Sequence, residues 1–216
     1  MRDILPDLIK KIPYTLYLGS VAFIIAFGLA IVLSLLLKSK IKPLVHLTKI
    51  YISFFRSTPY IMQLFILYFG LPQAFPAFLI INAEMALIIS IAMNSAAFIA
   101  EIIRGSLLSV EQGQIEAGLA CGLSKYHIAT RIVIPQAAVS AIPSLGNSYI
   151  NMIKSTSVGF TIGVVEMLSQ AKIGSTITFN FLEAYLVVGL LYWIIVVAIN
   201  KLQALLESHV GEYLIK

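Results

Sequence analysis

The sequence predicts an all-α integral membrane protein with five transmembrane helices. Of its 216 residues, 59% are hydrophobic and only 12% are charged, whereas an ordinary soluble domain has roughly 25% charged residues. The uncharged run over residues 14–37 is long enough to cross a hydrocarbon core about 30 Å thick. A second uncharged run covers residues 185–200. So few charges cannot build a water-soluble surface, which excludes a soluble globular protein.

The expected spans follow one another at residues 14–37, about 51–71, about 84–103, about 137–165 and 183–201. The first span is too long for the apolar core of a signal peptide, which has about 7–15 residues, so we expect it to be retained. Ala22, Ala26, Ala30 and Ser34 form a stripe of small residues along it. Such a stripe favours close packing against another helix.

The connections between the spans differ in polarity. Residues 41–50 are basic and partly apolar, which predicts an interfacial elbow. Residues 71–81 contain two prolines and are expected to form a tight turn outside the membrane. Residues 105–135 are the longest polar stretch, and residues 163–181 are a second, smaller loop. No internal repeat or linker divides the chain, so residues 1–216 are expected to form a single transmembrane domain that contains the loop over 105–135.

The basic residues predict the orientation of the chain. One face of the membrane would hold the connections after the first and third spans together with the C-terminus. Its ten basic residues are Lys38, Lys40, Lys42, Lys49, Arg56, Arg104, Lys125, Arg131, Lys201 and Lys216. The opposite face would hold four, namely Arg2, Lys10, Lys11 and Lys172. Because an excess of Lys and Arg marks the cytoplasmic side, we expect the N-terminus outside and the C-terminus in the cytoplasm.

Charge and composition also argue against several classes of site. The net charge of +5 does not indicate nucleic-acid binding, because the basic residues flank apolar spans and form no interleaved stripe. Arg56, at the cytoplasmic start of the second span, is expected to reach lipid phosphates. The histidines at 46, 127 and 209 are scattered without ligand partners, so no metal site is expected. Cys121 is the single cysteine and cannot form an internal disulfide.

Two of the expected spans carry polar stripes. In the fourth span, the positions i, i+4, i+7, i+11 and i+14 are Ser140, Ser144, Asn147, Asn151 and Lys154, and Ser155 and Thr156 extend the stripe. In the third span, the corresponding polar positions are Ser90, Asn94, Glu101 and Arg104. Helical stripes of this kind either line an aqueous path or join helices by hydrogen bonds, and both interpretations stay open for the Ser, Thr and Asn residues.

The charged residues of the two stripes help to decide between an aqueous path and hydrogen bonds that only join helices. An ammonium group in the middle of a bilayer costs about 2.5 kcal/mol or more on insertion scales. A functional or counter-charge role is therefore favoured for Lys154. Glu101 and Arg104 lie three residues apart, so they either pair with each other in a structural role or gate the path.

The polar loop over 105–135 predicts two short helices. Ser109 with Gln112 resembles a capping box that opens a helix over about 110–121. Gly122 can end this helix in a left-handed conformation. Ser124 is then expected to cap a second short helix, which Pro135 would stop. The loop is either an ordinary connection or a docking element, and its small residues Ala117, Gly118 and Ala120 suit a helix that lies closely in the groove of another protein.

The same loop resembles the coupling motif of ABC-importer permeases, which reads EAA, three residues, Gly, nine residues, I-x-L-P. The matching residues at the same spacing are Glu116, Ala117, Gly118, Gly122, Ile132, Ile134 and Pro135. Gly118 replaces the third Ala and Ile134 replaces the Leu. Other stretches are similar to polar amino-acid permeases, namely Y-T-L at 14–16, F-F-R-S-T-P at 54–59, Q-L-F at 63–65, A-E-I-I-R-G at 100–105 and I-K-S-T-S at 153–157. Y-F-G-L-P at 68–72 is closest in look to cystine-type permeases.

The resemblance implies a five-span permease of the bacterial inner (plasma) membrane that works as a homodimer or with a sister subunit. Two cytoplasmic ATP-binding subunits would dock at the coupling residues Glu116, Ala117, Gly118, Gly122, Ile132 and Pro135. An extracytoplasmic binding protein would deliver a polar amino acid, with L-cystine as the candidate. The candidate residues for the substrate path are Asn94, Glu101, Asn151, Lys154, Ser155 and Thr156. The sequence has no G-x-x-x-x-G-K-[ST] phosphate loop, so we do not expect this chain to be an enzyme or to need a cofactor.

Two other classes of transport protein would also span the membrane with helices. An ion-coupled secondary transporter would also carry polar stripes in its spans, but it would not need a long cytoplasmic helix–Gly–helix loop. Such folds also usually contain an internal repeat. A channel subunit would predict uptake that is independent of ATP. Co-purification with an ATPase separates the ABC permease from both alternatives.

Overall fold

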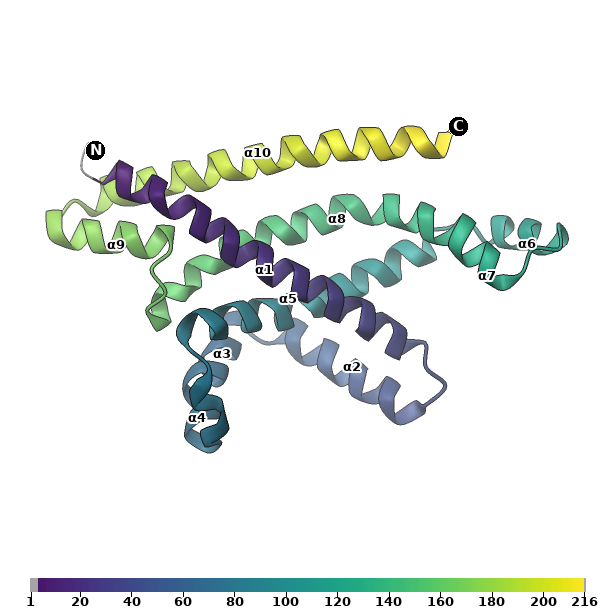
Figure 1. Ribbon diagram of the computed structural model, residues 1–216, viewed down its shortest axis with the longest axis horizontal. Coiled ribbons are helices and arrows are strands. Elements are labelled where there is room, and N and C mark those ends of the chain that lie inside the picture. Colours follow the sequence, from purple (N-terminus) through teal and green to yellow (C-terminus); the bar gives the residue numbers. More distant parts are fainter. Residues whose placement is uncertain (1–3, 216) are drawn as a thin grey trace.

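The computed structural model describes residues 4–215, with the backbone alone for residues 209 and 211–215, and these residues form helices and no strand (Figure 1). The α-helices are α1 (Leu5–Leu37), α2 (Lys42–Ser57), α3 (Tyr60–Phe65), α4 (Leu71–Ala74), α5 (Ala83–Leu108), α6 (Gln112–Ala120), α7 (Lys125–Ile128), α8 (Ile134–Ser155), α9 (Met167–Thr178) and α10 (Phe181–Ile215). Single π-helical turns cover Ile66–Gly70 and Ala129–Val133, and 3₁₀ turns cover Pro76–Ile80 and Thr156–Ile162.

Four helical segments in the described part of the chain are long and apolar enough to cross a membrane: Leu5–Leu37, Ala83–Leu108, Lys125–Ile162 and Phe181–Ser208. These four agree with four of the five expected spans. A shorter apolar helix covers Tyr60–Ala74. Figure 1 shows α1 and α5 running in the same direction along the molecule, so the chain between them must return to the starting side. The segment from α2 to α4 makes this return.

The expectation of one continuous second span over about 51–71 is wrong. The helix α2 already begins at Lys42, so the predicted elbow over 41–50 is its first part. The helix ends at Ser57, and Thr58 is extended with φ −108° and ψ 147° before Pro59. Proline excludes the α conformation at the residue before it and lacks the N–H that a helix interior needs. The chain therefore starts a new helix, α3, at Tyr60.

The core lies between α1 and α5, which pack along much of their length. The predicted small-residue stripe of α1 is buried there, because Ala22, Ala26 and Ala30 have no exposed surface. The facing helix α5 contributes Ala96 and Ala100, which are also fully buried. Small side chains on both helices let the two backbones approach closely, which is the main source of helix association where lipid removes the hydrophobic driving force.

The polar loop over 105–135 was predicted in part. The capping box is wrong, because Ser109 ends α5 and donates its hydroxyl to the Ser106 carbonyl at 2.9 Å, while Glu111 precedes α6 without a side-chain cap. The left-handed turn is confirmed at Gly122, where φ is 75°. The Leu123 N–H donates to the Gly118 carbonyl at 3.0 Å, which closes α6 in a Schellman motif.

The second half of the loop runs directly into the fourth span. The predicted cap is confirmed, since the Ser124 hydroxyl accepts a hydrogen bond from the His127 N–H at 3.3 Å. The predicted stop at Pro135 is wrong, because α7, the π-helical turn and α8 form one helical stretch. Pro135 lies in the first turn of α8, directly after the π-helical turn. A π-turn changes the backbone pairing and so accommodates a residue that has no N–H.

The connection over 163–181, expected to be a loop, contains the helix α9. Gly163 breaks the preceding 3₁₀ turn with φ 85°. Glu166 then caps α9, because its Oε1 atom accepts a hydrogen bond from the Ser169 N–H at 2.9 Å. Met167, Ala171 and Ser175 are buried four residues apart on one face of α9. Through this buried face, α9 packs against α1 and α10.

Candidate functional site

Three helices line a partly open cavity of about 520 Å³ that contains both charged and neutral polar side chains. It lies between the end of α2, the middle of α5 and the C-terminal part of α8. The lining residues are Arg56, Asn94, Ser95, Phe98, Glu101, Ile102, Ser148, Asn151 and Ser155. Four of the six residues predicted for a substrate path, namely Asn94, Glu101, Asn151 and Ser155, are therefore brought together in one cavity.

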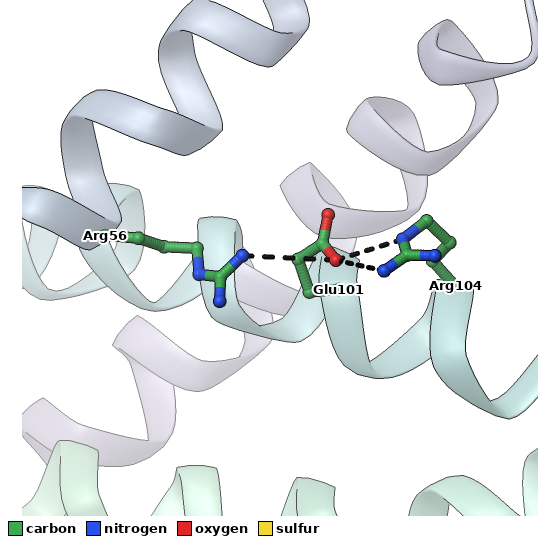
Figure 2. A network of polar contacts seen from close by, with 3 residues as sticks. All are labelled: Arg56, Glu101 and Arg104. Atoms are coloured by element: carbon green, nitrogen blue, oxygen red, sulfur yellow. Dashed lines mark hydrogen bonds and ion pairs between the residues drawn. The ribbon is translucent and has the colours of Figure 1, made fainter.

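Arg56 and Glu101 in the wall of this cavity form a charged triad with Arg104, which lies outside the lining, and Figure 2 shows Glu101 between the two arginines. Glu101 accepts hydrogen bonds from Arg104 at 2.7 and 2.9 Å through the same carboxylate oxygen. The Arg56 Nη1 atom lies 4.0 Å from that oxygen, at the limit of an ion pair. The predicted pairing of Glu101 with Arg104 is therefore confirmed. Arg56 is held more loosely, so its guanidinium is the cation of the triad that is most available to a ligand.

Asn94 connects the cavity to the break between α2 and α3. Its amide nitrogen donates to the Phe55 carbonyl at 2.9 Å and to Gln63 Oε1 at 3.0 Å. The Gln63 Nε2 atom in turn donates to the Thr58 hydroxyl at 2.8 Å. These bonds occupy both amide protons of Asn94 and satisfy carbonyl groups that the helix break leaves without helical partners. Within the described bonds, the oxygen of the Asn94 side chain stays available to the cavity.

The fourth-span residues divide into two groups. Asn151 and Ser155 line the cavity, and the Ser155 hydroxyl donates back to the Asn151 carbonyl at 2.8 Å. Lys154 is exposed and is not among the residues that line the cavity. Thr156 is fully buried, and its hydroxyl donates to the Ile153 carbonyl at 2.7 Å. The stripe read from the sequence was therefore wider than the wall of this cavity.

The predicted coupling segment forms a separate feature at one end of the molecule, where Figure 1 shows α6 and α7 at the end of the long helices. Glu116 and Ala117 are exposed on α6, whereas Gly118 is buried. A Cβ atom at Gly118 would lie 3.0 Å from Cγ1 of Ile128 and 3.4 Å from Cδ1 of Ile132. The absence of a side chain at Gly118 thus allows α6 to lie directly on the helix that leads into α8. Pro135 lies on that helix, in the first turn of α8.

Comparison with known proteins places these two features in a family. The family model described as "Binding-protein-dependent transport system inner membrane component" matches residues 30–212. The chain belongs to this family. It is an inner-membrane permease of the amino-acid ABC-importer type and crosses the bacterial membrane several times, as the sequence predicted.

Individual relatives of this permease agree with the family match. The probable amino-acid permease protein YxeN of Bacillus subtilis is 42% identical and covers 96% of this chain and 92% of its own. The L-cystine transport system permease protein TcyL of the same organism is 37% identical and covers 90% of this chain and 83% of its own. The solved structure of an amino acid ABC transporter with histidines has a TM-score of 0.88 and 32% identity, and the match covers 94% of each chain.

Sequence reasoning missed several lining residues of the permease. Ser95 and Phe98 lie on α5 beside the predicted stripe. Ser148 lies on α8, three residues before Asn151. The sequence predicts that Arg56 reaches lipid phosphates, but its guanidinium also lines the cavity and lies 5.7 Å from the ring of Phe98. The signal that could have found Arg56 is its position three residues before Pro59. A break there ends α2 at Ser57, so that Arg56 lies in its last turn beside the cavity.

Proposed function

We propose that this permease is the membrane-spanning subunit of an ATP-driven importer of a polar amino acid, with L-cystine as the candidate substrate. The observation that carries the proposal is the cavity of about 520 Å³ that offers opposite charges and neutral hydrogen-bonding groups together. Arg56 would attract the carboxylate of an amino acid, and Glu101 its ammonium group. Asn94, Asn151 and Ser155 would supply the neutral polar contacts along the path.

The choice of L-cystine rests on similarity alone. The relative TcyL is described as an L-cystine transport system permease protein and matches most of this chain. A second relative with that description, TcyB of Bacillus subtilis, is 35% identical over 98% of this chain. The cavity is compatible with this substrate class because a zwitterionic head group needs both charges that Arg56 and Glu101 provide.

ATP would be hydrolysed by two separate cytoplasmic subunits that dock on α6, around Glu116 and Ala117. Membership in the family implies such ATP-binding subunits and a second permease subunit. An extracytoplasmic binding protein would deliver the substrate from the other side. Movement of α6 would be transmitted along the continuous helix from α7 into α8, which carries Asn151 and Ser155 of the cavity.

The orientation that goes with this function has the N-terminus outside and the C-terminus in the cytoplasm. The excess of basic residues on the side of α6 supports it. The start of α1 and the end of α10 lie at opposite ends of the molecule in Figure 1, as an odd number of crossings requires. After replacement of Cys121, a cysteine at Gln73 should react with impermeant thiol reagents on intact cells, and a cysteine at Gln112 should not. The reverse labelling would overturn the orientation.

Ala117→Trp tests the coupling to ATP. The indole would fill the exposed surface of α6 on which the ATP-binding subunit is proposed to dock. We expect normal insertion, loss of co-purified ATP-binding subunit and at least tenfold lower uptake of labelled L-cystine in reconstituted vesicles. The matched control is Ala77→Trp, which puts the same side chain on an exposed residue of the 3₁₀ turn Pro76–Ile80.

The possible results of this experiment test the dependence on ATP and the identity of the substrate separately. Uptake at the unmodified rate in Ala117→Trp would contradict the ATP-driven function and favour an ion-coupled transporter or a channel. A different result would change only the substrate. The unmodified protein would then take up another polar amino acid but no L-cystine, and Ala117→Trp would abolish that uptake.

A further inference from the structure

The helix α6 lies along the helix that leads into α8, in an antiparallel register. Gly118 packs against Ile132, where a Cβ atom at Gly118 would lie 3.4 Å from Cδ1 of Ile132. One turn earlier on α6, Gln114 meets Gln136, which lies one turn later on the neighbouring helix. Residues four apart share one face of a helix, so both contacts belong to the same side of α6. Two points of contact fix the direction of a helix, whereas a single point lets it pivot.

The contacts of α6 lie on both sides of the π-helical turn Ala129–Val133. Ile128 and Ile132, which pack against α6, lie before and within this turn. Gln136 lies beyond it, in the first turn of α8. Its Nε2 atom donates a hydrogen bond to Gln114 Oε1. Among the described residues, this is the only side-chain hydrogen bond that connects α6 to another element.

The π-helical turn is a point where this helix bends easily. A π-turn interrupts the regular backbone pairing and is a common cause of kinks. Pro135 follows it directly and has no N–H to add to the pairing. A displacement of α6 that reached the helix through Ile128 and Ile132 alone would therefore be absorbed by bending at the turn. The bond to Gln136 carries the displacement past the turn to α8.

A second interruption of α8, at Pro143, is held from another helix. Gln203 of α10 donates through Nε2 to the Pro143 carbonyl at 3.2 Å. Gly146 permits this approach, because a Cβ atom there would collide with Gln203 Oε1. The part of α8 between the π-helical turn and the cavity residue Asn151 is thus supported at both of its weak points.

We propose that Gln114 and Gln136 are positioning residues that brace α6 against α8 across the π-helical turn. Through this brace, a movement of α6 would reach Asn151 and Ser155 at the cavity. The inference rests on the proposed function, in which the ATP-binding subunit docks on α6. The brace is distinct from docking, because breaking the bond leaves the exposed surface of α6 at Glu116 unchanged.

The bond between the two glutamines is suited to coupling rather than to folding. Gln114 is exposed and Gln136 is half-buried, so water competes for both amides. One hydrogen bond of this kind shifts an equilibrium by about two- to tenfold. Its loss should lower the share of complexes in which α6 and α8 move together, and it should leave the packed spans intact.

The test measures ATP hydrolysis and uptake side by side in vesicles that contain the complex of the permease with its ATP-binding subunits. Labelled polar amino acids, including L-cystine, are supplied together with the binding protein. In Gln114→Leu and in Gln136→Leu, we expect the ATP-binding subunit to co-purify and the uptake per hydrolysed ATP to fall by about two- to tenfold. The double leucine variant should fall no further, because either single change already breaks the bond.

Substitution by glutamate separates the hydrogen bond from an effect of shape or charge at either position. Gln114→Glu or Gln136→Glu alone leaves one amide that can donate to the new carboxylate, so the uptake per hydrolysed ATP should stay unchanged. Both changes together leave two carboxylates without a donor, and the uptake per hydrolysed ATP should fall as in the leucine variants. The control is Ser140→Ala, which removes the hydrogen bond from Ser109 to Ser140 at 3.1 Å on α8 but keeps the amide pair. It should couple as the unmodified protein does.

Three results would overturn the brace while the unmodified complex still shows ATP-driven uptake. The first is an unchanged uptake per hydrolysed ATP in Gln114→Leu, and the second is additive losses in the double leucine variant. The third is loss of the ATP-binding subunit from Gln114→Leu, which would place this residue in docking instead. Absence of ATP-driven uptake in the unmodified complex would contradict the proposed function itself, so the two failures are distinguishable.

Discussion

The chain changes direction at two places that look equally sharp but are held in different ways. At Gly122, between α6 and α7, the turn is closed by backbone hydrogen bonds that stay within six residues, such as Leu123 N–H to the Gly118 carbonyl. At Thr58 and Pro59, between α2 and α3, the side chain of Asn94 reaches in from a helix that is 39 residues away from Phe55 in the sequence. One turn is local and the other depends on tertiary contacts.

The difference matters for the proposed function because one turn positions the docking helix α6 and the other positions Arg56 at the cavity. The turn at Gly122 sets the direction of α6, on which the ATP-binding subunit is proposed to dock. The break at Thr58 ends α2 at Ser57, next to Arg56, and so places the guanidinium in the wall of the cavity between α2, α5 and α8. Damage to the local turn should therefore affect coupling alone, whereas damage to the tertiary break should affect stability and transport together.

Asn94→Leu should have the largest effect, because it removes the tertiary support of the break. The leucine has a similar volume but cannot donate to the Phe55 carbonyl or to Gln63. The Phe55 carbonyl keeps a second donor, Gln63 Nε2 at 3.2 Å, so the acceptor left unsatisfied is Gln63 Oε1, and such a loss costs about 1–3 kcal/mol. For a protein of this size, each kcal/mol lowers the Tm by about 2–4 °C. We expect this fall in a thermal-stability measurement of the detergent-solubilised protein, together with at least tenfold slower uptake.

Asn147→Leu is the control for this prediction. Asn147 is an exposed residue on α8, and it forms no hydrogen bond within the described part of the chain. The same substitution there removes an amide from a membrane helix without leaving a partner unsatisfied. Equal Tm values for the two variants would show that the hydrogen bonds of Asn94 do not hold the break.

Gly122→Val should have a smaller effect on stability and a specific effect on coupling. A residue with a Cβ atom at φ 75° costs about 1–2 kcal/mol, which corresponds to a roughly 5–30-fold smaller population of the native turn. Because α6 is mostly exposed, it can relieve this cost by reorienting without unfolding of the packed spans. We therefore expect normal insertion and little change in Tm, but loss of the ATP hydrolysis that loaded binding protein stimulates. Gly122→Asn should keep most of this stimulation, because asparagine tolerates the left-handed region. If both variants behave alike, the positive φ is not what couples α6 to transport.

The same contrast explains what the sequence could predict. Composition and uncharged runs were sufficient for the membrane class, and four expected spans appear as long apolar helices. Gly122 and Ser124 were predicted correctly because the backbone requirement and the residue that meets it are neighbours. The number of five crossings stays a prediction, since Tyr60–Ala74 is shorter than the other four segments.

The errors fall where a distant or unusual contact decides the structure. The break at Pro59 was missed because the apolar residues on both sides look like one span, and its partner Asn94 belongs to another helix. The prediction that Pro135 stops a helix failed because the preceding π-helical turn, which has no sequence signal of its own, accommodates the proline. For the cavity, helical periodicity found Asn151 and Ser155, but it also included Lys154, which does not line the cavity.

Gly118→Ala should have the smallest effect and would sharpen the account of the local turn. Alanine stabilises a helix interior by up to about 1 kcal/mol relative to glycine. At Gly118, however, the new Cβ would lie 3.0 Å from Cγ1 of Ile128, so part of this gain is lost in moving that side chain. Gly113→Ala, on the same helix with no atom within 4 Å of its Cβ, should keep the gain. We therefore expect slower hydrogen exchange of the α6 amides in Gly113→Ala than in Gly118→Ala. The opposite order would show that the contact between α6 and Ile128 is loose, and that the turn at Gly122 alone fixes the direction of α6.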